Sequence, residues 1–103
     1  MYVNGEWIEA RSGQSFAVVN PATGERIGEV PAGDDRDATA AIAAADAAFA
    51  QWGATTAHHR ADLLMDAWRL MTERAGELAE LMTIEQGKPL RASTFEVGYA
   101  ADF

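Results

Sequence analysis

The chain of 103 residues contains no cysteine, little proline and no long apolar run. Without cysteine it has no disulfide, no thiolate metal site and no thiol nucleophile of its own. No apolar run approaches the roughly 20 residues of a transmembrane helix. The residues after Met1 have neither the basic nor the apolar region of a secretory signal. We therefore expect a cytoplasmic protein that has no membrane partner.

Basic residues are also few, with 8 lysines and arginines against 16 aspartates and glutamates, which gives a net charge of −8. An acidic surface repels nucleic acid and anionic lipid, so we expect neither as a partner. The hydrophobic content of 49% is ordinary for a globular protein. A chain of this length predicts one small domain over residues 1–103.

Short β-forming segments separated by turn residues predict a small antiparallel β-meander over residues 2–31. Asn4–Gly5 predicts a type I′ hairpin turn, because both central positions of that turn need positive φ. Ser12–Gly13 predicts a second turn. Asn20–Gly24 predicts a third, since Asn can bond its own backbone, Pro fixes φ and Gly supplies an unusual dihedral angle.

From residue 34 the apolar spacing becomes helical and predicts three to four helices over residues 34–103. Asp34 or Asp35 is the expected N-cap of the first helix, and Thr56 that of the second. Gly76 is a candidate break between two helices. Gly87 fits the left-handed position after a helix, and the following Pro89 fits the first turn of the last one.

The apolar faces of these helices predict a small core that contains Ile42, Phe49, Leu64, Leu70 and Leu81. The last helical pattern is still in progress at Phe103, so we expect the encoded chain to continue beyond it.

Few residues suggest chemistry. His58 and His59 are neighbours on a helix and point about 100° apart, so a solvated first turn explains them better than a metal site. The acidic run at residues 34–37 lacks the ligand spacing of a calcium loop, and helix capping explains it better. Lys88 is expected to be exposed. Glu85 is a weak candidate for a general base, because no thiol or serine partner is apparent.

Tryptophans Trp7, Trp52 and Trp68 are expected to be core or interface anchors, since the basic residues of a nucleic-acid platform are missing. No glycine-rich phosphate loop is present. We therefore predict no catalytic residue and no cofactor-binding residue within this chain.

Four segments give the sequence a family resemblance: Asn4–Trp7, Asn20–Glu25, the Ala47-Ala48-Phe49-(x2)-Trp52 pattern, and Thr83–Pro89. Together, and in this order, they resemble the opening of an aldehyde dehydrogenase. The resemblance implies an α/β fold of which residues 1–103 form the first part of the cofactor-binding domain. In that domain the helices flank a doubly wound parallel sheet whose strands come later.

The resemblance implies that the intact protein is a homo-oligomeric enzyme that oxidises an aldehyde to the carboxylic acid with NAD or NADP. In the family a cysteine thiolate adds to the aldehyde, hydride leaves to the nicotinamide, and a carboxylate helps water to release the acyl-enzyme. The residues responsible lie downstream of this chain. Residues Leu81–Leu90 and Glu96–Phe103 look most like succinate-semialdehyde dehydrogenases, with glutarate-semialdehyde and 2-oxoglutarate-semialdehyde enzymes as close alternatives. The competing interpretation is a stand-alone, non-catalytic module that binds a partner through its apolar helical faces.

Some members of the family bind a monovalent cation through two backbone carbonyls and one acidic side chain. By resemblance, the matching positions are Val18, Val19 and Glu96. The alternative for Glu96 is an ordinary exposed glutamate on a helix, as glutamates usually are.

Overall fold

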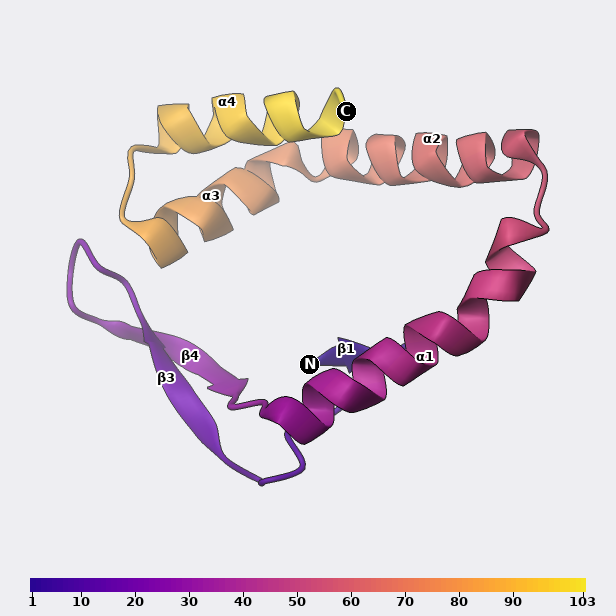
Figure 1. Ribbon diagram of the computed structural model, residues 1–103. Helices are drawn as coiled ribbons and strands as arrows, with labels where there is room; N and C mark the ends of the chain where they lie inside the picture. Colours follow the sequence, from indigo (N-terminus) through magenta and orange to yellow (C-terminus); the bar gives the residue numbers. More distant parts are fainter. The chain divides into compact units, whose positions relative to one another are not determined.

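The computed structural model describes all 103 residues, which fall into two compact units (Figure 1). The first unit contains Met1–Val18 and Gly28–Thr55, and the second contains Val19–Ile27 and Thr56–Phe103. The elements in chain order are β1 (Tyr2–Val3), β2 (Glu6–Trp7), β3 (Ser15–Val19), β4 (Arg26–Pro31), α1 (Asp35–Gly53), α2 (Ala57–Glu73), α3 (Ala75–Gln86) and α4 (Leu90–Ala101). The predicted order, strands first and then helices, is confirmed.

The strands form two separate two-stranded sheets, β1–β2 and β3–β4, where the sequence predicted one continuous meander. In the first sheet Tyr2 lies opposite Trp7 in antiparallel register, and the centroids of their rings are 5.3 Å apart. The predicted Asn4–Gly5 turn is confirmed by φ angles of 53° and 82°. The two sheets are not joined because the segment between them bonds locally: Gly13 N–H donates to the carbonyl oxygen of Ala10 at 2.8 Å.

Helix starts follow the predicted caps. Asp34 caps α1, and the Thr56 hydroxyl accepts the His59 N–H at 3.1 Å at the start of α2. The break between α2 and α3 lies at Arg74, whose φ of −102° and ψ of 15° leave the helical region. The candidate break at Gly76 is wrong, because this glycine lies within the first turn of α3, where it is tolerated at a modest cost in stability.

Helices α3 and α4 form a tight antiparallel hairpin in the second unit (Figure 1). Gly87 ends α3 in the left-handed conformation predicted for it, with φ of 69°, and its N–H donates to the Thr83 carbonyl at 2.8 Å. Pro89 caps α4. Helix α4 extends to Ala101, and Asp102 at its C-cap keeps helical dihedral angles, with φ of −76° and ψ of −6°. The expectation that the encoded chain continues beyond Phe103 stays a prediction.

Large apolar side chains are mostly exposed. The buried hydrophobic residues are Ala10, Ala79 and Val97. The predicted core is wrong, since exposed fractions are 69% for Ile42, 73% for Phe49, 71% for Leu64, 58% for Leu70 and 51% for Leu81. The physical reason is area: two-stranded sheets and one helical hairpin are too small to cover the apolar stripes of α1 and α2. None of the four helices combines the length and the apolar character that crossing a bilayer demands.

Candidate functional site

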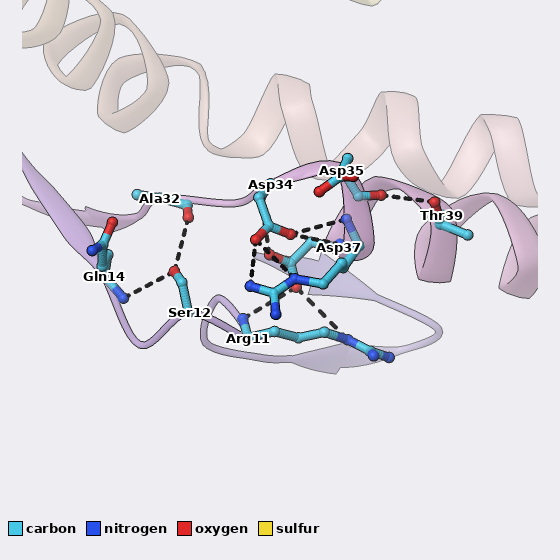
Figure 2. Close-up of polar contacts among 9 residues, drawn as sticks. Arg11, Ser12, Gln14, Ala32, Asp34, Asp35, Asp37 and Thr39 are labelled. Atoms are coloured by element: carbon cyan, nitrogen blue, oxygen red, sulfur yellow. Dashed lines mark hydrogen bonds and ion pairs between the residues drawn. The ribbon is translucent and has the colours of Figure 1, made fainter.

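The densest group of charged residues lies at the start of α1 in the first unit (Figure 2). The Asp34 carboxylate accepts the Asp37 N–H at 3.4 Å and the Arg36 N–H at 2.9 Å, and the Asp37 carboxylate in return accepts the Asp34 N–H at 3.0 Å. This reciprocal arrangement is a capping box, which satisfies N–H groups that have no partner within the helix. The predicted capping role of the acidic run is confirmed.

Asp37 also ties a distant segment to α1. It is 5% exposed and accepts the Arg11 N–H at 3.2 Å, while the Arg11 Nε lies 4.0 Å from the same carboxylate (Figure 2). No side-chain polar atom is buried without a partner. Both carboxylate oxygens of Asp37 therefore accept hydrogen bonds from the backbone and have a structural role.

Arginine neighbours shift the acidity of two exposed carboxylates. The Arg36 guanidinium, which donates to Asp34 at 2.6 Å, lowers the pKa of Asp34, and the pKa of Arg36 is raised in turn. The Arg74 guanidinium in the same way lowers the pKa of Glu77. Both shifts favour the charged forms of surface ion pairs at helix starts, which is the direction expected of structural pairs.

The histidines and tryptophans singled out in the sequence form no common site. His58 and His59 are exposed in the first turn of α2. No group of three histidine, aspartate or glutamate side chains converges in a way that could hold a metal ion. The tryptophans are not core anchors, because Trp7 is 82%, Trp52 48% and Trp68 41% exposed. Their role at an interface stays a prediction.

The two segments with the clearest family resemblance touch in the second unit. The Asn20 side chain accepts the Ala22 N–H at 2.9 Å, which confirms the predicted turn. This turn lies against Gly87: a Cβ atom on Gly87 would be 3.0 Å from the Ala22 nitrogen and 3.0 Å from Pro21 Cγ. Contacts that short require a neighbour to move, so glycine is needed for close approach as well as for its dihedral angle.

Two polar side-chain pairs in the α3–α4 hairpin were missed from the sequence. The hydroxyl groups of Thr83 and Ser93 are hydrogen bonded at 2.8 Å, and Ser93 is fully buried. Lys88 Nζ donates to Glu96 Oε2, and the Lys88 side chain is only 20% exposed. The expectation of an exposed Lys88 is therefore wrong. The short Gly87–Pro89 connection, which folds α4 back on α3, is the signal that could have predicted both pairs.

Glu85 lines a hollow of about 300 Å³ whose other lining residues are mostly apolar, from α2, α3 and α4: Met71, Leu78, Leu81, Met82, Gln86, Val97 and Ala100. No nucleophilic side chain lines this hollow.

The cation set of Val18, Val19 and Glu96 stays a prediction. Val18 belongs to the first unit, whereas Val19 and Glu96 belong to the second. Glu96 is the one member that supplies a charged ligand, and its carboxylate already accepts a hydrogen bond from Lys88.

Comparison with known proteins gives one consistent answer. The sequence model described as the aldehyde dehydrogenase family matches residues 7–103. Glutarate-semialdehyde dehydrogenase of Pseudomonas putida is 49% identical over 99% of this chain and 21% of its own length. The NADP(+) succinate-semialdehyde dehydrogenase of Escherichia coli is 46% identical over 98% of this chain and 21% of its own length.

Solved structures agree with the sequence relatives. The succinate-semialdehyde dehydrogenase of Burkholderia pseudomallei superposes with a TM-score of 0.95 at 43% identity, over 97% of this chain and 21% of that chain. This confirms the predicted aldehyde dehydrogenase-like α/β fold class. The chain spans about a fifth of the length of the curated relatives it matches (21%). On the family match and these identities, the chain belongs to the aldehyde dehydrogenase family.

Proposed function

We propose that this chain is the N-terminal part of an NAD(P)-dependent dehydrogenase that oxidises a short aldehyde bearing an acidic group, with succinate semialdehyde as its first substrate. The observation that carries the proposal is 46–50% identity to glutarate- and succinate-semialdehyde dehydrogenases over nearly the whole chain.

The names of the relatives support the substrate class. At 41–50% identity they include enzymes for glutarate, succinate, malonate and aspartate semialdehydes and for 3-sulfolactaldehyde. Each of these aldehydes carries a carboxylate or a sulfonate. A betaine aldehyde dehydrogenase of Staphylococcus aureus, whose named substrate is cationic, is 32% identical. The similarity therefore favours an anionic aldehyde.

Within that proposal the 103 residues form the first portion of the cofactor-binding domain, and their role is to build the framework. The caps of α1 and α2, the buried Asp37 and the α3–α4 hairpin hold backbone segments in place. The dinucleotide and the aldehyde bind to residues further along the intact protein. We propose that this protein is cytoplasmic and homo-oligomeric, and that it has neither nucleic acid nor membrane as a partner.

The substrate proposal is tested on the intact protein. kcat/KM is measured for succinate semialdehyde, glutarate semialdehyde, acetaldehyde and betaine aldehyde, with NAD and with NADP. We expect the semialdehydes to be preferred, with succinate semialdehyde highest. A preference of more than about tenfold for acetaldehyde or betaine aldehyde, or about 1.4 kcal/mol in transition-state binding, would contradict the assignment.

The chain of 103 residues should itself be inactive, because it supplies no cysteine for the covalent step. It is incubated with semialdehydes and NAD or NADP, and nicotinamide absorbance is followed. Turnover that depends on the chain and exceeds the background rate would contradict this proposal. A heat-denatured sample of the same chain is the control.

The second candidate function is a stand-alone interaction module, and the exposed apolar faces of α1 and α2 favour it: Phe49 is 73% and Leu64 71% exposed. In that case a separate catalytic chain would supply the chemistry, and mixing the two chains would restore activity. Failure of mixing to restore activity, together with an encoded chain that continues past Phe103, would exclude it.

A further inference from the structure

Lys88 and Glu96 form an ion pair across the turn of the α3–α4 hairpin, within the second unit. Its cation is unusually enclosed. The Lys88 side chain is 20% exposed, whereas the paired side chains of Arg11, Arg36, Arg69 and Arg74 are between 58% and 62% exposed. The Lys88 ammonium is therefore held against the protein in a way that the surface arginines are not.

The backbone on both sides of Lys88 is restricted, which fixes the point from which its side chain extends toward Glu96. Gly87 is fixed in the left-handed conformation by its bond to Thr83 and by the close approach of Pro21 and Ala22. Pro89 has its φ fixed by the proline ring, at −60°. A charged group that is positioned in advance loses less conformational freedom when it binds its partner.

This geometry bears on the monovalent cation that the family resemblance implies. The backbone carbonyls of Val18 and Val19 are neutral, so Glu96 would have to supply the whole negative charge of the site. That carboxylate already accepts a hydrogen bond from an ammonium group. A second cation beside it would be repelled by the first, because like charges at close range disfavour each other. With Lys88 paired to it, Glu96 does not fit the role of the charged ligand of a free alkali-metal ion.

We propose that the Lys88 ammonium is the cation bound at Glu96, in place of the monovalent metal ion. The fold thus carries its own cation, attached to the turn that joins α3 to α4. The protein should then not distinguish potassium from sodium at this position, because neither ion binds there. The inference does not depend on which aldehyde the intact protein oxidises.

The test is thermal unfolding of the 103-residue chain, at a concentration at which sedimentation shows a monomer, followed by circular dichroism in potassium, sodium and choline chloride at equal ionic strength. We expect the wild-type melting temperature to be the same in all three salts. Lys88→Met keeps the aliphatic stem and removes the charge. It should lower the melting temperature by about 1–8 °C in choline chloride, the shift expected for a single ion pair at the protein surface in a chain of this size. Potassium or sodium should recover part of this loss.

Matched variants separate the ion pair from a general charge effect. Arg91→Met removes an exposed cation on α4 that forms no ion pair, and it should leave both the melting temperature and its independence of salt unchanged. Lys88→Arg keeps the charge and should behave as wild type toward the three salts. In the Lys88→Met/Glu96→Gln double variant, the recovery by potassium or sodium should be lost.

A direct binding measurement keeps the test independent of stability. Line broadening of the sodium-23 resonance should be the same for the wild type and Glu96→Gln, and larger for Lys88→Met. The proposal is overturned if the wild type is stabilised by potassium or sodium through Glu96, since the metal ion then binds despite Lys88. It is equally overturned if Lys88→Met responds to the three salts as the wild type does.

Discussion

The hydroxyl oxygens of Thr83 on α3 and Ser93 on α4 lie 2.8 Å apart, and Ser93 has no exposed surface. Ser93→Ala leaves the Thr83 hydroxyl without this partner at a part-buried position. We expect the free energy of unfolding to fall by about 1–3 kcal/mol, the usual cost of a buried polar group left unpaired. Urea denaturation measures the loss.

Thr94→Ala is the control for Ser93, because the exposed Thr94 hydroxyl bonds only the Leu90 carbonyl of its own helix. It should change the free energy of unfolding by no more than about 0.5 kcal/mol. Equal effects of the two substitutions would contradict the importance of the α3–α4 hydrogen bond.

Gly87 and Gly98 should respond to alanine in opposite directions. At Gly87 the φ of 69° and the Ala22 nitrogen at 3.0 Å both oppose a Cβ atom, and the left-handed conformation alone costs about 1–2 kcal/mol. At Gly98, inside α4, nothing lies within 4 Å of an added Cβ atom. There alanine should stabilise by up to about 1 kcal/mol through its higher helix propensity. Melting temperatures of the two variants test this, and a stabilising Gly87→Ala would refute it.

Acid should remove the stabilising contribution of Asp34. Because Arg36 lowers the pKa of Asp34 in the folded state, folding favours the ionised carboxylate. This contribution is complete above the unfolded value, near 3.8, and is lost as the pH falls through the lower folded value. The variant Asp34→Asn keeps an N-cap acceptor but does not titrate. The difference in melting temperature between wild type and Asp34→Asn should therefore shrink as the pH falls below about 4, and a constant difference would contradict the argument.

The exposed apolar faces should make the isolated chain associate. Phe49 is 73% exposed on α1, and Phe95 is 73% exposed on α4. Large exposed apolar areas favour self-association. We expect binding of a hydrophobic dye and a sedimentation coefficient that rises with concentration. Phe49→Gln should reduce dye binding without lowering stability. Val97→Ala, at a side chain that is 4% exposed, should lower stability. A monodisperse monomer that binds no dye and melts sharply at high temperature would contradict the expected association.

Local structure was predictable where single residues determine the backbone. Asp34, Thr56 and Gly87 each mark a helix end through a specific hydrogen bond or a positive φ, and all three were predicted correctly. These effects act over a few residues and need no knowledge of what lies nearby in space.

Packing was not predictable in the same way. The helical spacing of Ile42, Leu64 and Leu81 identified apolar faces correctly. The spacing does not reveal which other segment, if any, packs against each face. The Lys88–Glu96 and Thr83–Ser93 pairs depend on how α4 folds back on α3; the short Gly87–Pro89 connection indicates the fold-back, but the facing residues follow from the packing of the two helices. The family motifs identified the relatives correctly, and that the catalytic residues lie downstream of this chain stays a prediction.

The contact between the Asn20–Gly24 turn and Gly87 makes the second unit discontinuous in sequence. Val19–Ile27 belongs with Thr56–Phe103, although the intervening residues 28–55 belong to the first unit. A polypeptide that began at Thr56 would lack the turn that lies against Gly87, and one that ended at Thr55 would leave this turn without its neighbour. No single cut can therefore separate the two units, and dissecting the chain would require a circular permutation or a linker that bypasses residues 28–55.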